Sequence, residues 1–334
     1  MAILTKNFHV WYKVINKKGE SLTFYNDDTP QHNFPIGFEV NFNDSPTPSV
    51  NTVTLYNLSK SHSDFFEKNQ KCYLYANWGP SKKLISEGFI TKIDTTQHDG
   101  TTDTKVLNFT EGTDYNNVKA NRLKVEKKKE VKKSKLVKVT RPGHYENKII
   151  NHHRKHVWVP AKEVNRRVKT RETKTIRSNK TYRKGTSYET LIKGIAAQCG
   201  IKISKLQLHK NPVLKHAYTA KGKPLTLIKQ LVKHTESSFN YVQGRLEIVD
   251  PKSEKRTWLE IDDQDLIQPP SSDQSDSNDK KKTWEITIPM VPEIVTNTGI
   301  VMRSNYLKGR FYVKSGQHTS DGDNPQTQCS LVAM

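Results

Sequence analysis

Basic residues in this 334-residue chain are concentrated in one stretch, and this segregation limits the fold more than any other feature of the sequence. Residues 122–184 contain 23 Lys and Arg against five acidic residues, and so carry +18 of the formal net charge of +21. The other 271 residues contain 32 basic and 29 acidic residues. Because blocks of like charge repel one another, such a segment does not build an ordinary apolar core. The pattern therefore predicts ordinary folded parts separated by a cationic insert.

The length predicts about two domains, each able to bury a core without disulfides. Cys72, Cys199 and Cys329 are too few and too widely spaced for a disulfide framework or a zinc site, and we expect buried thiols in a reducing compartment. No stretch approaches the roughly 18 apolar residues of a membrane span. The N-terminal residues alternate in polarity and do not resemble a signal peptide. We expect a protein made in the cytoplasm with no membrane anchor of its own.

The N-terminal part, residues 1–121, has the pattern of a mainly β domain. Residues 8–15 alternate so that one side of a strand carries Phe8, Val10, Tyr12 and Val14. Short runs rich in β-branched and aromatic residues, separated by turn signals, follow at 36–42, 51–58, 71–78, 84–93 and 104–112. These runs predict an antiparallel sandwich or a small barrel. Residues 59–69 predict a short helix that covers one end, with Phe65 and Phe66 inward.

The insert itself, residues 122–184, leaves two structures open. Lys127 to Lys135 is almost entirely charged, whereas residues 136–139 and 157–159 resemble short strands that flank Pro142-Gly143 and a polar run. An extended β arm would accommodate this pattern. A disordered or solvated loop would do so as well.

Hydrophobic periodicity changes from two to about 3.6 after the insert and predicts an α/β module over residues 185–250. Thr186 and Glu189 have the spacing of a helix capping box. Gly200 suits the end of that helix. Its buried face is expected to contain Leu191, Ile192, Ile195 and Cys199.

The same module is expected to contain a strand at 201–204 and a second helix that begins at Pro224. That helix would bury Leu225, Ile228, Leu231 and Val232. A β-hairpin is expected over residues 239–249, with Gln243-Gly244 at its turn.

Strand patterns return over residues 251–334 and predict a second β domain. A Pro/Ser/Asp-rich run at 268–282 predicts a mobile loop. The expected strands lie on either side of that loop, at 257–263, 283–290, 299–304 and 309–316, before a closing segment at 324–334. The fold class is therefore mainly β with a small α/β module, in four parts: 1–121, 122–184, 185–250 and 251–334.

No motif for catalysis, a cofactor or a metal stands out. Phosphate-binding glycine loops, HExxH and Gly-x-Ser-x-Gly are absent from the sequence. His152 and His156 have a helical ligand spacing, but they lie in a strand-like, strongly basic segment that disfavours a divalent cation. Asp321 and Asp323 are better explained by turn chemistry than by a calcium loop. The pair Asp262 and Asp263 resembles solvated surface. We expect no catalytic, cofactor-binding or metal-ligating residues, and no enzyme.

Four strings in order resemble the central baseplate or tail hub proteins of tailed phages and phage tail-like bacteriocins. They are NTVTLYNLSKSHSDFFEKNQKCYLYANWG followed by SEGFITKI, then KGTSYETLIKGIAAQCGIKI, then KGKPLTLIKQLVKHTESSFNYVQGRLEIVD, and finally TWEITIPMVPEIVTNTGIVMRSNYLKGRFYVKSGQHTSDGD. The resemblance implies two β-barrel-like domains per chain and a homotrimeric ring. That ring would join a hexameric tail tube to the spike or tip in the baseplate of a virion tail.

The implied partners are the tube and distal tail proteins, the spike or tip protein, and tape measure protein or DNA in the lumen. The cationic insert departs from the family pattern, and no peptidoglycan-cleaving region follows, so we expect wall digestion to come from another protein.

The insert also supports a second hypothesis, a nucleic-acid-binding protein, although its sparse aromatic residues do not suggest a base-stacking platform. An unrecognised hydrolase is a third. For the insert we predict contact with an anionic partner, an acidic tail protein or DNA, through Lys127, Lys128, Lys129, Lys132, Lys133, Lys135, Arg166, Arg167 and Arg171.

Overall fold

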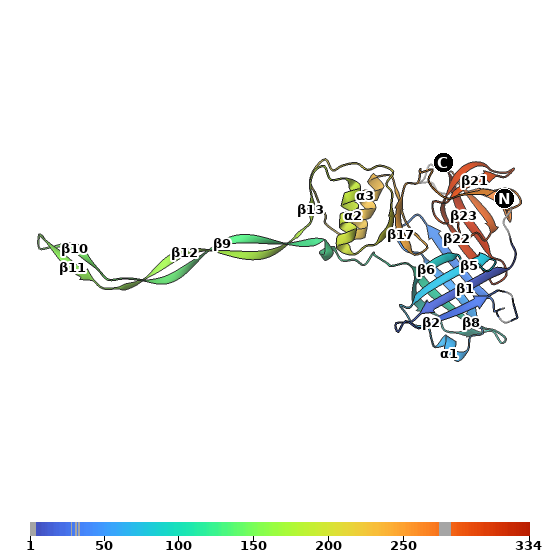
Figure 1. Cartoon of the computed structure of the whole chain (residues 1–334), viewed down its shortest axis with the longest axis horizontal. Helices are drawn as coiled ribbons and strands as arrows, with labels where there is room; N and C mark the ends of the chain where they lie inside the picture. Colours follow the sequence, from blue (N-terminus) through green and yellow to red (C-terminus); the bar gives the residue numbers. More distant parts are fainter. Residues whose placement is uncertain (1–4, 28, 31, 33, 274–281) are drawn as a thin grey trace. The chain divides into compact units, whose positions relative to one another are not determined.

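The computed structural model describes residues 5–27, 29–30, 32, 34–273 and 282–334. The chain divides into two units, which are treated separately below. One unit comprises Met1–Leu123 and Thr181–Met334, and the other comprises Lys124–Lys180. Figure 1 shows the strands, the two helices α2 and α3, and the two-stranded ribbon formed by the second unit.

The N-terminal strands pair antiparallel, some with the next strand in the sequence and others with more distant strands, and they cover an apolar core. Val10, Tyr12 and Val14 are fully buried in this core, as the alternation predicts. The strand at Ser21–Asn26 was not predicted; it forms because it pairs with the first strand along its whole length. The strands are β1 (Phe8–Ile15), β2 (Ser21–Asn26), β3 (Ile36–Asn43), β4 (Val50–Tyr56), β5 (Lys71–Trp78), β6 (Leu84–Ile93), β7 (Gln97–His98) and β8 (Asp103–Glu111).

The helix predicted over residues 59–69 is much shorter in the structure. Helix α1 spans Lys60–Ser63, and the Ser59 hydroxyl accepts a hydrogen bond from the His62 amide. Beyond it, the Gln70 side chain donates to the Phe65 carbonyl at 2.8 Å and accepts from the Glu67 amide at 2.9 Å. These side-chain bonds satisfy backbone groups that a longer helix would have used. Phe66 is nevertheless buried against the core, as expected.

The C-terminal strands form a second apolar core. Strand β19 pairs antiparallel with β20, so the prediction of a loop from Gln268 is wrong for Gln268–Asp273. The remaining loop positions 274–281 lie outside the described residues. The strands are β18 (Trp258–Ile261), β19 (Gln268–Asp273), β20 (Thr283–Pro289), β21 (Gly299–Arg303), β22 (Lys308–Ser320) and β23 (Gln326–Ala333).

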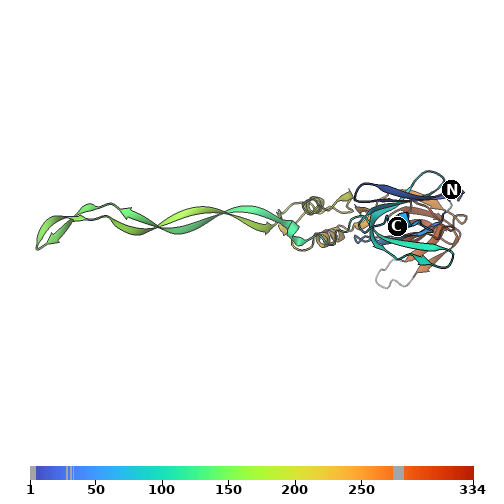
Figure 2. The same ribbon diagram turned by 90° about the horizontal axis from the view of Figure 1, so that it is seen from below.

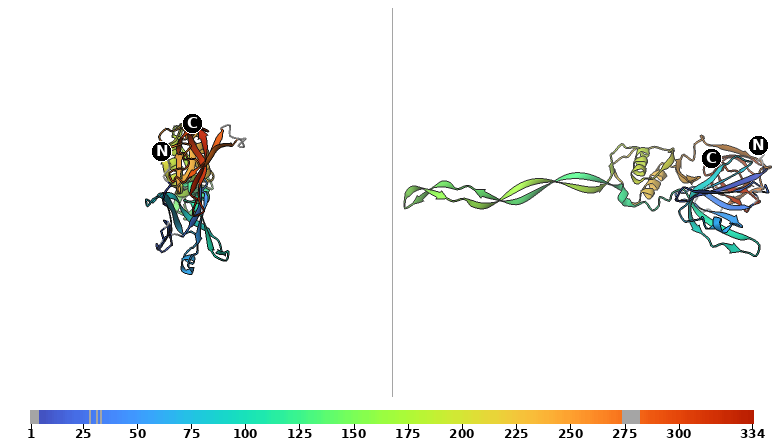
Figure 3. Two further views of the ribbon diagram at one scale, coloured as in Figure 1. Left: turned by 90° about the vertical axis from the view of Figure 1, so that its right-hand side faces the viewer. Right: turned by 60° about the horizontal axis from the view of Figure 1, so that its bottom comes forward.

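A single strand pairing merges the two sets of strands into one sheet. Residues Ser315–Ser320 of β22 lie antiparallel to Phe38–Asn43 of β3, and the strand order runs β19-β20-β23-β22-β3-β4-β8-β6-β5-β1-β2. In Figure 3 the red C-terminal strands can be followed beside the blue N-terminal strands. The Trp78 indole N–H donates to the Met290 carbonyl at 2.8 Å. The two cores are therefore held together by both backbone and side-chain bonds.

The α/β module packs two helices against a three-stranded sheet. Helix α2 spans Tyr188–Cys199 and α3 spans Pro224–His234. All the helical residues predicted to be inward are buried in one cluster. The sheet order is β14 (Ile203–Leu206), β17 (Arg245–Val249) and β16 (Ser238–Val242). A short pair, β13 (Thr181–Tyr182) with β15 (Tyr218–Thr219), and the 3-10 turn η1 (Ala120–Leu123) complete the module.

The predicted capping box is wrong by one residue. Ser187 is the N-cap of α2, and its hydroxyl accepts a hydrogen bond from the Thr190 amide. The Thr186 hydroxyl instead donates to the Arg183 carbonyl at 2.8 Å. At the other end Gly200 has a φ of 71°, the left-handed conformation expected of a terminating glycine.

The second unit is a long two-stranded hairpin, which we call the arm. It consists of β9 (Lys124–Arg141), β10 (His144–Ile150), β11 (His153–Val159) and β12 (Lys162–Asn179). Figure 2 shows how the two sides of the hairpin, β9 with β10 and β11 with β12, twist about each other. Of the two structures that the sequence left open, the extended β arm is correct. The short strands expected at residues 136–139 and 157–159 are parts of longer ones.

Candidate functional site

The arm has one constant register from its base to its tip. Lys124 lies opposite Asn179, and Ile150 lies opposite His153. At the tip, Asn151 and His152 have φ values of 51° and 64°, the pair of left-handed residues that a two-residue hairpin turn requires. The ladder is interrupted where Pro142-Gly143 faces Pro160, because proline has no amide hydrogen to donate.

Residues on the two faces of the arm differ in kind. Residues directly opposite each other in an antiparallel pair point to the same face, and successive residues alternate between faces. One face of β9 and β12, the valine face, contains all of their Val and Ile residues. These are Val125, Val131, Val137, Val139, Val164, Val168 and Ile176. On the other face, the polar face, Leu136 is the single apolar residue.

Positive charge is crowded along both faces. Lys129 lies opposite Lys174, Lys132 opposite Arg171, and Arg141 opposite Lys162, and near the tip Lys148 lies opposite Lys155. Like charges directly opposite each other destabilise a β pair. Three of the four cross-strand ion pairs lie on the polar face and join Glu126 to Arg177, Glu130 to Arg171 and Glu163 to Lys138. The valine face has one, between Lys133 and Glu172.

The structure places all nine predicted contact cations on the exposed surface of the arm but divides them between its faces. The valine face has Lys127, Lys129, Lys133, Lys135 and Arg166. The polar face has Lys128, Lys132, Arg167 and Arg171. Lys133 and Arg171 have acidic partners within the arm.

The chain leaves the α/β module at Leu123 and re-enters it at Thr181. At each of these two points an apolar side chain is buried in the module. Leu123 and Tyr182 belong to the buried cluster of the module. A Cβ added to Gly194 of α2 would lie 2.8 Å from the Tyr182 hydroxyl oxygen. Sequence analysis missed this anchor, because nothing in the local pattern connects Tyr182 to a helix glycine.

A buried carboxylate lies where the α/β module meets the N-terminal strands. Burial raises the pKa of Glu111 to about 7, although hydrogen bonds from the Gly244 and Gln243 amides act in the opposite direction. The Gln243 side chain donates to the Leu84 carbonyl at 2.7 Å, and the Gly112 amide donates to the Glu87 carbonyl at 2.8 Å. The turn at Gln243-Gly244 is thus hydrogen-bonded to Leu84 at the start of β6 and to Glu111 at the end of β8.

A buried histidine, His318, joins separate segments of the C-terminal core by hydrogen bonds. His318 Nε2 lies 3.0 Å from the Ile294 carbonyl, which can only accept, so Nε2 carries the proton and Nδ1 accepts from the Thr327 hydroxyl at 2.9 Å. Thr327 in turn accepts from the Val291 amide. Burial lowers the pKa of His318 to about 4. The ring is therefore a neutral structural bridge.

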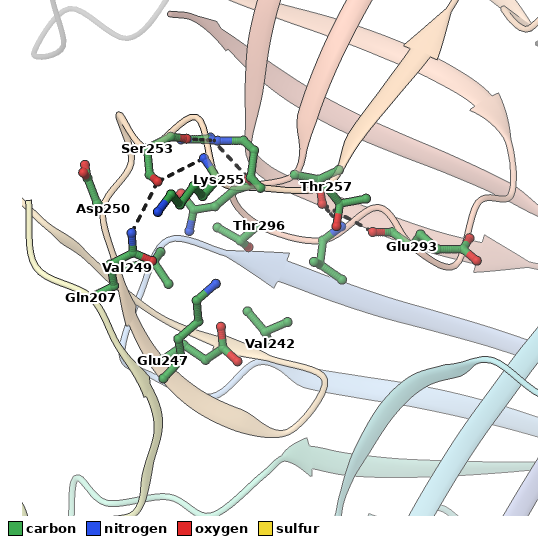
Figure 4. A pocket seen from close by; sticks show the side chains of 15 residues that line it. Gln207, Val242, Glu247, Val249, Asp250, Ser253, Lys255, Thr257, Glu293 and Thr296 are labelled. Atoms are coloured by element: carbon green, nitrogen blue, oxygen red, sulfur yellow. Dashed lines mark hydrogen bonds between the residues drawn. The ribbon is translucent and has the colours of Figure 1, made fainter.

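Figure 4 shows a polar pocket of about 150 Å³ between the hairpin of the α/β module and the C-terminal strands. Gln207 donates to Ser253 on one side, and Glu293 lies on the other. Arg256 also lines the pocket, but its guanidinium donates to the carbonyls of Pro251, Ser253 and Asn297. These bonds give Arg256 a structural role in the loop that connects the module to the last strands.

The other side chains weighed in the sequence have ordinary structural places. His152 lies in the hairpin turn and His156 in strand β11, and the described part of the chain contains no cluster of three or more potential metal ligands. Asp321 accepts from the amides of Asp323 and Asn324, which confirms its turn role. Asp263 accepts from the Asn305 amide. Asp262 accepts from the Gln264 amide.

The three cysteines are buried and unpaired, as predicted. Burial raises the pKa of Cys72 and of Cys329 to about 12, so both thiols stay protonated. Within the described residues, no helix is long and apolar enough to span a membrane.

Comparison with known proteins gives no match to any family model and none to a curated protein sequence. Solved structures do match. The 43 kDa tail protein of prophage MuSo2 from Shewanella oneidensis superposes with a TM-score of 0.57 at 10% identity, over 98% of each chain. A tail protein from Neisseria meningitidis superposes with a TM-score of 0.55 at 9% identity, over 98% of this chain and 96% of that one. This chain has the fold of phage tail proteins.

The tail-protein fold extends to secretion machinery. A component of the Escherichia coli type VI secretion system, described as similar to the T4 phage tail proteins gp27 and gp5, superposes with a TM-score of 0.52 at 7% identity. That match covers 90% of this chain and 74% of the other. The mainly β fold class predicted from the sequence is confirmed, and the resemblance to phage tail proteins is confirmed at the level of the fold.

Proposed function

We propose that this protein is a structural component of a phage tail, the homotrimeric baseplate hub that joins a hexameric tail tube to the spike or tip. The observation that carries the proposal is the sheet shared by two β cores. Residues Ser315–Ser320 and Phe38–Asn43 join these cores within a chain that shares its fold with phage tail proteins over 98% of its length. Three chains with two β cores each would present six similar units to a sixfold tube.

The hub proposal assigns the four sequence segments to different tasks. Residues 1–121 and 251–334 would form the ring around a DNA channel, residues 185–250 would brace it, and residues 122–184 would contact an anionic partner. The strand order ends at β2 and β19. A neighbouring chain that covers these edges would remove the liability of unpaired strands.

A hub has a mechanical role, and the buried polar bonds of this chain suit one. Glu111, His318 and Trp78 each connect segments far apart in the sequence. Buried hydrogen bonds between distant segments favour one arrangement of the parts over others. We propose no catalytic role for the protein, and place it in the baseplate of a virion assembled in the host cytoplasm. Its partners there would be tube, distal tail and tip proteins, and tape measure protein or DNA in the lumen.

The hub proposal is tested by the mass and shape of the purified protein. Native mass spectrometry over a range of concentrations should show three copies, and negative-stain images should show a ring with a central opening. A chain in which residues 132–171 are replaced by Asn-Gly keeps the base of the arm and a two-residue turn, and should form the same ring. A stable dimer would contradict the proposal.

We also propose that the arm contacts an anionic partner through its nine predicted cations. Crowded, mostly unpaired positive charge is stabilised when an anionic surface neutralises it. Replacing Lys127, Lys128, Lys129, Lys132, Lys133, Lys135, Arg166, Arg167 and Arg171 with Gln should strongly weaken salt-dependent binding to acidic polymers and leave the oligomeric state unchanged. If DNA is the partner and about six phosphates are neutralised, log affinity should fall with log salt with a slope of about −5.

A further inference from the structure

The two faces of the arm are too different to be explained by strand propensity. Val and Ile favour any β strand, and propensity alone would place them on both faces. Seven of the eight Val, Ile and Leu side chains of β9 and β12 instead lie on the valine face. Because an isolated two-stranded hairpin is marginally stable in water, this unpartnered face is the place where a binding partner would add stability.

Four valines on this face form a contiguous patch. Val139 lies directly opposite Val164, and Val137 and Val168 are the next apolar positions on the same face. Their side chains remain 36–40% exposed. The other four residues of the four successive same-face pairs that contain these valines are all basic: Lys135, Arg141, Lys162 and Arg166. No acidic residue lies among these eight positions, since Glu172 pairs further along with Lys133.

We propose that this patch, Val137, Val139, Val164 and Val168 with their four surrounding cations, binds an acidic protein surface that presents apolar side chains among its carboxylates. The inference rests on the proposal that the arm contacts an anionic partner, and it identifies the chemistry of that partner. Apolar contact would remove the valines from water, and carboxylates would pair with the surrounding cations.

The same observations disfavour two other binding partners, a second copy of the arm and a nucleic acid. A second copy of the arm would bring eight cations and one acidic residue of each valine face against the same set. Like charges so placed oppose association. A nucleic acid would neutralise the cations, but phosphates give the valines no apolar contact. Neither β9 nor β12 contains an aromatic residue on which bases could stack.

The proposal is tested by the binding of two labelled peptides to the full-length chain. Both contain about 16 residues and the same number of glutamates, one with the repeat Val-Thr-Glu-Thr and the other with Thr-Thr-Glu-Thr, so that they differ only in apolar side chains. We expect the valine peptide to bind about tenfold more tightly in fluorescence polarisation, since burying a few methyl groups has an effect of this size.

Substitutions in the arm show which face is responsible. The variant with Val137→Thr, Val139→Thr, Val164→Thr and Val168→Thr keeps charge and strand propensity, and should bind both peptides equally. The control Leu136→Thr removes the single apolar side chain of the polar face, and should keep the tenfold preference. Far-UV circular dichroism checks that the arm of each variant is still folded. The preference of the wild-type chain for the valine peptide tests the proposal even if a variant does not fold.

Each other result has a clear meaning. Equal, salt-dependent binding of both peptides to the wild-type chain would overturn the valine-patch proposal while leaving the anionic contact intact. Absence of salt-dependent binding to either peptide and to a DNA duplex of about 20 base pairs would overturn both. Duplex binding that exceeds peptide binding and is unchanged by the Val→Thr variant would assign the arm to nucleic acid. Self-association that disappears in the Val→Thr variant would assign the patch to a second copy.

Discussion

The Glu111 carboxylate accepts a hydrogen bond from the Gly244 amide at 2.9 Å, across 133 positions of sequence. This bond joins the end of β8 to the hairpin turn of the α/β module. A Cβ on Gly244 would lie 2.3 Å from Glu87 Cγ, so the turn approaches the strands too closely for any larger residue. The position of the module on the sheet thus depends on a buried acid and a glycine.

The free energy of unfolding should depend on Glu111 in a defined pH window. Its pKa is raised from 4.5 to about 7 by burial, so the folded state holds the proton more tightly than the unfolded state. The stabilising contribution is complete below about pH 4.5 and is lost as the pH rises through 7. Urea unfolding should be measured for the wild type and for Glu111→Gln at pH 5 and at pH 8. The difference in free energy of unfolding between the two proteins should change by about 2–3 kcal/mol between these pH values. The exposed control Glu39→Gln should show no such change.

His318 should have the opposite pH dependence. Its pKa is lowered from 6.5 to about 4, so the folded state holds the neutral ring. The stabilising contribution is present above pH 6.5 and is lost as the pH falls through 4. The variant His318→Gln should be less stable than the wild type at pH 7, and this difference should shrink on acidification to pH 4.5. A difference between the two proteins that stays constant with pH would contradict the lowered pKa of His318. Exposed His62→Gln is the matched control.

Gly194→Ala should destabilise the protein although alanine favours helices. In an exposed helix position this change would stabilise by about 1 kcal/mol. Here the new methyl group would lie 2.8 Å from the Tyr182 hydroxyl and 3.0 Å from the ring edge. We expect a net loss of about 1–3 kcal/mol in thermal or urea unfolding, reduced in a Tyr182→Phe background. The neighbouring exposed change Lys193→Ala should cost only a few tenths of a kcal/mol.

Lys174→Glu should stabilise the arm. Lys174 lies directly opposite Lys129, and the substitution replaces a repulsive pair with an attractive one. Such cross-strand pairs contribute about 0.2–1 kcal/mol, which should appear as slower amide hydrogen exchange in β9 and β12. Lys174→Gln removes the repulsion without adding attraction and should give an intermediate result. Faster exchange in Lys174→Glu than in the wild type would contradict the register.

Local patterns were sufficient to predict most elements of this fold. The alternation of Val10, Tyr12 and Val14 predicts a half-buried strand, and the spacing of Leu191, Ile195 and Cys199 predicts the inward face of α2, because these periodicities follow from backbone geometry. The failures are also local. The Thr186 hydroxyl donates to the Arg183 carbonyl and does not cap α2. The Gln70 side chain donates to the Phe65 carbonyl, in a segment where a longer helix was expected. Both outcomes depend on competition between hydrogen bonds, which a sequence pattern does not reveal.

The sequence by itself determined where the charge lies, most of the strands and helices, and the kind of fold. Only the tertiary structure decided the register of the arm, and with it the assembly of Val137, Val139, Val164 and Val168 on one face. The same is true of the pairing of β22 with β3 and of the bond between Glu111 and Gly244. The physical reason is distance along the chain. These contacts join residues tens to hundreds of positions apart, and their free energy depends on burial and close approach in the folded molecule.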